Sequence, residues 1–192
     1  FCTGYNTKGC FQFLDKSYDK KYKQIFVPND KTIFFVGFIR PYLTAIPMLV
    51  ELQTRWVAKV IVGKVKLPSE GEMLKEIGED RERQIKEFPC AYGRVPIVDP
   101  YDYCNMIGKK IGAMPNLLKL FFMNNTLWKN IMFDSWNHHI FRLNDEDLEK
   151  VRIAEENIMD YNSNDTSNVI RDTIVTKLKY GLGTVSYTHL TL

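Results

Sequence analysis

The most constraining feature of the sequence is the apolar run at residues 33–39, which reads Ile-Phe-Phe-Val-Gly-Phe-Ile and ends at Arg40-Pro41. A continuous apolar run rich in aromatic and β-branched residues is typical of a strand covered on both faces, as the central strands of parallel α/β sheets are. A helical pattern comes next, at about residues 47–62. We therefore predict a buried strand, a tight turn and then a helix.

The predicted helix has an apolar stripe and a signal at each end. Pro47 lies in its first turn and Gly63 just past its last, which are the positions that these residues favour. The apolar residues of one helical face are Leu49, Leu52, Trp56 and Val60.

Two more helices are expected from local patterns. Ser69 and Glu72 have the spacing of a capping box, which opens a highly charged and largely solvated helix that ends at about residue 87. Residues 136–143 are expected to be extended, and residues 145–159 to form a final amphipathic helix.

Between these segments, proline and glycine mark two further helices. The Asp99-Pro100 pair starts one that Gly112 closes, and Pro115 starts another that ends at about residue 123. Aromatic residues in this part of the chain are more often core than cofactor contacts, so they are expected to pack. They are Tyr101, Tyr103, Phe121, Phe122 and Trp128.

Residues 6–31 alternate aromatic residues with Lys and Asp, and contain Gly9, Pro28 and Asn29. This pattern predicts an irregular crossing between two domains. The interleaved lysines and tyrosines resemble a single-strand nucleic-acid surface, but neighbouring aspartates dilute the charge, which favours a solvated loop. The lysines concerned are Lys16, Lys20, Lys21 and Lys23.

Charge and cysteine usage exclude several classes of partner. The chain has 26 basic and 23 acidic residues, and a net charge of +3 is too balanced to indicate nucleic acid or acidic lipid. The four cysteines show no C-x-x-C spacing, and His138 and His139 would point to opposite faces of a strand, so no metal site is expected. No apolar run reaches the roughly 20 residues that span a bilayer.

Several short motifs succeed one another in a characteristic order. Cys2-Thr3-Gly4-Tyr5 comes first, and residues 33–56 then combine a Gly-Phe-Ile turn, an Ile-Pro pair and a Leu-Gln-x-Arg-Trp helix. Leu67-Pro68-Ser69-Glu70, residues 111–116 and residues 133–143 come later. In this combination, over about residues 1–160, the chain resembles the flavin-containing monooxygenases.

The resemblance implies an α/β fold, with a few strands and several helices. This would be the C-terminal part of a flavoprotein that has two Rossmann-like dinucleotide-binding domains, for FAD and NADP. The family's two Gly-x-Gly-x-x-Gly loops and its Phe-x-Gly-x-x-x-His signature are not found in the sequence. We therefore expect a C-terminal fragment of a longer enzyme.

The resemblance also suggests how the chain is divided. Residues 1–31 would end an NADP-domain strand and connect the domains, and residues 32–160 would be the C-terminal portion of the FAD-binding domain with a helical extension. Residues 161–184 form a tail without an assigned role. Residues 185–192 resemble translated sequencing-adapter DNA, and we expect them to be non-native.

The resemblance implies a set of cofactor-binding residues but no catalytic side chain. Residues 37–44 would lie at the pyrimidine edge of the flavin, near the N-terminus of the predicted helix, whose positive end suits the charge of a reduced ring. The family usually has Gln where this chain has Arg40. The expected cofactor-binding residues are Thr3, Gly4, Tyr5, Gly37, Phe38, Arg40 and Thr44.

Each of these residues also has a purely structural interpretation. Gly37 lets either a packed helix or a flat ligand approach the backbone closely. Arg40 adds a fixed charge to the flavin edge or to NADP, or it is a salt-bridged residue at a domain seam. The Thr3-Gly4-Tyr5 strand end lets a dinucleotide pass close, or it is a plain turn. The residues alone leave these alternatives open.

The function implied by the resemblance is NADPH- and FAD-dependent monooxygenation. The intact enzyme would transfer one oxygen atom from O₂ to an amine nitrogen or a sulfide through a flavin C4a-hydroperoxide, whereas the fragment alone would be inactive. The protein would be intracellular, in the cytoplasm or associated with the endoplasmic reticulum membrane. Alternatives are a related flavoprotein, such as a Baeyer–Villiger monooxygenase, and a non-catalytic helical interaction module.

Overall fold

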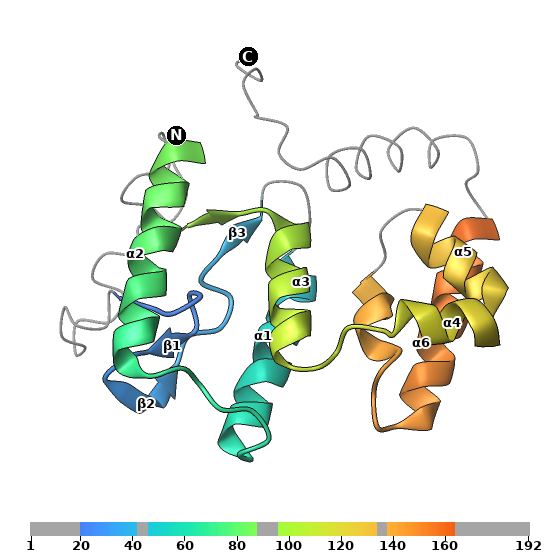
Figure 1. The fold of residues 1–192 in the computed structure, drawn as a ribbon, viewed down its shortest axis with the longest axis horizontal. Coiled ribbons are helices and arrows are strands. Elements are labelled where there is room, and N and C mark those ends of the chain that lie inside the picture. Colours follow the sequence, from blue (N-terminus) through green and yellow to red (C-terminus); the bar gives the residue numbers. More distant parts are fainter. Residues whose placement is uncertain (1–19, 42–45, 88–95, 134–137, 164–192) are drawn as a thin grey trace. The chain divides into compact units, whose positions relative to one another are not determined.

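The computed structural model describes residues 20–41, 46–87, 96–133 and 138–163 (Figure 1). The chain divides into two compact units, residues 1–111 and residues 112–192. The described part combines several helices with short strands, in one antiparallel and one parallel pair. This mixture fits the predicted α/β class.

The described part of unit 1 begins with a tight turn and a hairpin. Lys23 and Gln24, at the centre of the turn, have φ of +49° and +64°, as both central residues of a type I′ turn do. Strands β1 (Phe26–Val27) and β2 (Asp30–Phe34) then pair antiparallel. The irregular structure predicted for residues 6–31 is therefore wrong where β1 and β2 form, whereas the crossing between two domains stays a prediction.

The apolar run at residues 33–39 is not one strand. Strand β2 ends at Phe34, and residues 35–39 leave regular structure before β3 (Arg40–Pro41), which pairs parallel with β4 (Ile97–Val98). Gly37 has φ of +84°, which a strand does not accommodate. The prediction of a single buried strand was wrong, although Phe35 and Ile39 are buried.

The described part of unit 1 also contains three helices. Helix α1 (Ile46–Ile61) packs against α3 (Pro100–Lys110), and α2 (Glu70–Glu87) runs along the other side of the strands (Figure 1). The Trp56 ring contacts Phe26 and Tyr22 edge-on, with centroids 4.9 and 6.1 Å apart. Buried apolar side chains from α1, α3 and the first turn therefore form one core.

The predicted helix signals of unit 1 are confirmed. The Ser69 N–H donates to Glu72 Oε2 at 2.8 Å, so the capping box is formed, and Met73 is the only buried residue of α2 among those described. Asp99 caps α3, accepting hydrogen bonds from two backbone N–H groups. Gly63 and Gly112 have positive φ, as residues that end helices often do.

Unit 2 contains helices α4 (Leu117–Met123), α5 (Asn125–Phe133) and α6 (Leu148–Ser163), with a 3₁₀ helix η3 (His138–Arg142). Helix α5 packs against α4 and α6, and α6 packs against η3. Helices α4 and α6 were predicted, whereas α5 was not. The expected extended segment at residues 136–143 is wrong for residues 138–142.

The apolar face of α4 is open to solvent. None of its residues is buried, and Leu118 and Phe122 are 76% and 82% exposed. The packing role predicted for Phe122 is therefore wrong, although the Phe121 ring contacts Trp128 with centroids 4.9 Å apart. Across the described residues, no helix is long and apolar enough to cross a membrane, and no cluster of acidic, Cys and His side chains could hold a metal.

Candidate functional site

The structure describes three of the seven predicted cofactor-binding residues, and they lie close together along the chain. Gly37 and Phe38 lie in the irregular segment between β2 and β3, and Arg40 begins β3. Phe38 is half-buried, and its ring packs edge-on against Phe35, with centroids 5.5 Å apart. The other four residues, Thr3, Gly4, Tyr5 and Thr44, lie outside the described residues.

Gly37 is required by its backbone conformation. Its φ of +84° is rarely adopted by L-residues. A Cβ at this position would lie 3.6 Å from Val50 Cγ2, which is an ordinary contact. Helix α1 therefore does not need a glycine here for close approach, and the geometry supports the role of Gly37 in a turn.

The backbone N–H of Gly37 donates to Gln53 Oε1 at 2.8 Å. Gln53 lies on α1, is completely buried, and is the one buried polar or charged side chain in the core of the described residues. Its Nε2 donates to the Tyr103 hydroxyl at 2.7 Å, and that hydroxyl donates to the Lys23 carbonyl oxygen at 2.7 Å. A hydrogen-bonded chain thus connects the Gly37 turn, α1, α3 and the Lys23 turn.

This chain of hydrogen bonds contains no charged group. Burial raises the pKa of the Tyr103 phenol well above its usual value, so the hydroxyl keeps its proton. A buried amide and a buried phenol that satisfy each other avoid the cost of unpaired polar atoms in the core. The arrangement can hold backbone in place, but it offers no group that would exchange a proton near neutral pH.

Beyond the Lys23 carbonyl, the contacts become ionic. The Lys23 ammonium lies 3.0 Å from Glu76 Oε2 and 2.7 Å from Asp80 Oδ2, and the side chain is only 12% exposed. Burial by itself would raise the pKa of Glu76, but hydrogen bonding and charge from Lys23 outweigh it, and the net pKa lies below the usual value. The expected solvated loop is therefore wrong for Lys23, which is fixed against α2.

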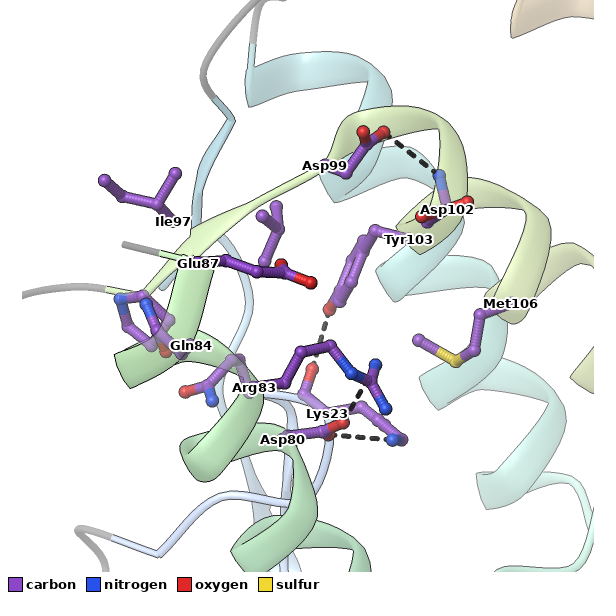
Figure 2. Close-up of a pocket in the computed structure, with 13 residues that line it drawn as sticks. Lys23, Asp80, Arg83, Gln84, Glu87, Ile97, Asp99, Asp102, Tyr103 and Met106 are labelled. Atoms are coloured by element: carbon purple, nitrogen blue, oxygen red, sulfur yellow. Dashed lines mark hydrogen bonds and ion pairs between the residues drawn. The ribbon is translucent and has the colours of Figure 1, made fainter. Parts of the chain in front are cut away.

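These groups border a pocket of about 180 Å³ (Figure 2). The Lys23 turn, the second half of α2, β4 and the start of α3 line it. Figure 2 shows Tyr103 pointing toward Lys23, with Asp80 and Arg83 beside them. The Arg83 Nη1 atom is 3.7 Å from Asp80 Oδ1. The charged side chains at the centre of the pocket neutralise one another, which favours a structural role over catalysis.

Arg40 lies in a different electrostatic setting. Its backbone N–H donates to the Pro96 carbonyl at 2.9 Å, while the side chain is exposed and forms no ion pair with another described residue. Helix α1 starts soon after, and its first turn contains no acidic residue to offset the positive end of the dipole. This part of the chain is suited to an anionic group.

The sequence prediction did not single out Gln53 and assigned Tyr103 to packing alone. Tyr103 is buried, as expected, but it also relays two hydrogen bonds. Gln53 had a signal in the sequence, because it lies four positions after Leu49 and three before Trp56. A polar residue at such spacing lies beside an apolar stripe and needs buried partners.

Comparison with known proteins shows similarity over nearly the whole chain. The family model described as flavin-binding monooxygenase-like matches residues 1–182. The chain is 34% identical over 125 residues to a 4-hydroxybenzoate brominase (decarboxylating) from Pseudoalteromonas luteoviolacea, covering 63% of this chain and 24% of that protein. It is 32% identical over 152 residues to the N-oxide-forming dimethylaniline monooxygenase 2 of Mus musculus, covering 74% and 28%.

A human relative has a similar sequence identity and coverage. The chain is 34% identical over 154 residues to flavin-containing monooxygenase 3 of Homo sapiens, covering 74% of this chain and 28% of that protein. The chain thus spans about a quarter of the length of the curated relatives that it matches.

Proposed function

The chain belongs to the flavin-binding monooxygenase-like family, and on this basis we propose that the full-length protein is an FAD- and NADPH-dependent monooxygenase. Its substrates would be soft nucleophiles, with an amine nitrogen or a sulfide sulfur as the oxidised atom, and O₂ would be the second substrate. The observation that carries this proposal is the family match over residues 1–182, together with relatives named as monooxygenases.

The flavin would bind at the turn between β2 and β3. Phe38, Arg40 and the first turn of α1 would hold it, together with Thr44, which lies outside the described residues. The fit rests on charge, because an exposed guanidinium and a helix whose first turn lacks a carboxylate favour an anionic group. Gly37 would contribute through the path of its backbone, because its N–H already donates to Gln53.

When bound, FAD would accept hydride from NADPH and then activate O₂ for transfer of one oxygen atom. The chain's own residues would orient the ring and favour its reduced form. Positive potential from Arg40 and α1 would stabilise negative charge at the nearest edge of the ring. No side chain of the described part needs to act as a general acid or base in this scheme.

Relatives named as brominases give a second candidate function. The chain is 34% identical to the Pseudoalteromonas luteoviolacea brominase and likewise 34% identical, over 119 residues, to one from Marinomonas mediterranea. Bromide, like an amine or a sulfide, is a soft nucleophile. The same activated oxygen could therefore be used to oxidise bromide for attack on a phenolic acid.

Purified full-length protein would test both functions. We expect bound flavin in the visible spectrum, loss of its colour with NADPH under nitrogen, and oxygen consumption in air. Product analysis with dimethylaniline, with a thioether, and with bromide plus 4-hydroxybenzoate would assign the substrate class. A well-folded full-length protein that binds no flavin would refute the proposal and favour the non-catalytic interaction module.

Three further parts of the proposal concern the chain itself and its location. We expect the 192-residue chain to hold FAD weakly and to show no turnover, which titration of flavin fluorescence would check. We keep the division into an interdomain connection and a flavin-domain portion at residue 32 as a proposal. Cell fractionation of the full-length protein would test association with the endoplasmic reticulum membrane.

A further inference from the structure

We propose that Gln53 is a positioning residue, which fixes the orientation of the Gly37 turn and so places Phe38 and Arg40. The inference about the turn stands on the hydrogen bonds of Gln53. Its consequence for the cofactor rests on the proposed function, in which this turn faces the flavin.

The direction of every hydrogen bond around Gln53 is determined. The Gly37 N–H can only donate, so the carbonyl oxygen of the Gln53 amide must face it, at 2.8 Å. The Lys23 carbonyl can only accept, so the single hydroxyl proton of Tyr103 points there. The Tyr103 oxygen is then left to accept from Gln53 Nε2. Turning the Gln53 amide over would break both of its contacts.

This polarity selects one orientation of the peptide between Val36 and Gly37. A flipped peptide would present the Val36 carbonyl oxygen to Gln53 Oε1, and two buried acceptors would repel each other. Glycine by itself does not make this choice, because it populates many backbone conformations. The buried amide therefore provides the restraint that Gly37 lacks.

The restraint is anchored at its far end as well. Tyr103 holds the Lys23 carbonyl, and the Lys23 side chain is paired with Glu76 and Asp80 on α2. Gln53 itself is buried on α1, between helix and turn. Through these contacts the Gly37 turn is connected to α1, α2 and α3. Gln53 is therefore suited to fix the positions of the residues just after the turn.

Amide hydrogen exchange on the 192-residue chain would test the restraint directly. Gln53→Met preserves size but removes the acceptor, so the Gly37 amide should exchange on the order of tenfold faster relative to the amides of Leu52 and Trp56. Gln53→Glu keeps an acceptor for Gly37, and a carboxyl that stays protonated in this buried site also keeps a donor for Tyr103, so the Gly37 amide should retain its protection. Thr54→Ala is the matched control, because Thr54 is the next residue, is exposed and bonds only within α1, to the Val50 carbonyl at 2.8 Å.

A second variant keeps the test valid if Gln53→Met does not fold. Tyr103→Phe removes only the hydroxyl, so it frees Gln53 Nε2 while leaving the bond to Gly37 in place. We expect a smaller acceleration at Gly37 than in Gln53→Met. Equal acceleration at all amides of unit 1, or unchanged exchange at Gly37 in both variants, would overturn the proposal.

The full-length enzyme would then show whether the turn positions the cofactor. Gln53→Met should shift the flavin absorption spectrum and increase the O₂ consumed per product molecule, while Gln53→Glu restores both. If the wild type binds no flavin, the proposed function fails but the exchange result stands. If flavin binds, and neither its spectrum nor the coupling changes although Gly37 exchange does, the role of Gln53 toward the cofactor is refuted.

Discussion

Replacing Gly37 with alanine should destabilise unit 1 by about 1 kcal/mol, because backbone strain in the folded state exceeds the effect of the substitution on the unfolded chain. An L-residue in the left-handed region costs about 1–2 kcal/mol, and φ at this position is +84°. Alanine also lowers the conformational entropy of the unfolded chain, and this offsets about 0.4–1 kcal/mol of the strain. The contact of the new Cβ with Val50 Cγ2, at 3.6 Å, adds no clash.

Urea unfolding monitored by circular dichroism would measure this cost. With a slope of about 2 kcal/mol per molar urea, a loss of about 1 kcal/mol lowers the midpoint by about 0.5 M. Because the chain has two units, the transition of unit 1 should shift while that of unit 2 stays in place.

Two glycines of the same unit serve as controls. Gly63→Ala places alanine at φ of +73° with no atom within 4 Å, so it should show a similar loss without touching the Gly37 turn. Gly78→Ala lies inside α2 with open space around it, and should stabilise by about 0.5–1 kcal/mol. A Gly37→Ala variant as stable as the wild type, or one that loses more than about 3 kcal/mol, would refute strain as the sole reason for this glycine.

Three other outcomes are expected. Asp99→Ala removes the cap of α3 and should cost about 1 kcal/mol in urea unfolding, with Asp99→Asn close to wild type. The ion pair between Lys23 and Glu76 contributes its full stability above the ordinary carboxyl pKa of about 4.3, and this contribution is lost as pH falls through the lower pKa that Glu76 has in the folded chain. Acid should therefore lower the urea midpoint of unit 1, and it should lower it less in Lys23→Met, which lacks the pair. Burial, aided by Asp99, raises the pKa of Cys104 to about 12, so iodoacetamide should label this thiol at pH 8 only after unfolding; labelling of the native chain would contradict its burial.

The sequence predicted the elements whose signals are local. The capping box that starts α2 consists of two residues within one helical turn. The signals at both ends of α1 and its apolar stripe likewise lie within one short segment. These interactions form between neighbours along the chain, so the sequence contains all the partners. For this reason α1, α2 and α3 were predicted with nearly correct bounds.

The sequence did not predict features whose partners are distant. An apolar run does not reveal whether its neighbour is parallel or antiparallel, and here β2 pairs with β1 while β3 pairs with β4, more than 50 positions away. Gln53 bonds to Gly37 and Tyr103, which lie 16 and 50 positions away along the chain, so its partners depend on how α1 and α3 pack. The segment at residues 138–142 shows the same limit, because this 3₁₀ helix packs against α6, a partner that the local sequence does not reveal.

Helix α4 contributes no buried side chain to a core, and this limits how firmly it is held. Seven residues are too few for a helix to persist in water by propensity, and α4 is held by its Asn116 cap and by the ring contact between Phe121 and Trp128. Such a segment opens by itself at little cost while the rest of its unit stays folded. Limited digestion with a protease that cleaves after aromatic residues should therefore cut first at the exposed Phe121-Phe122 pair, close to the boundary between the two units.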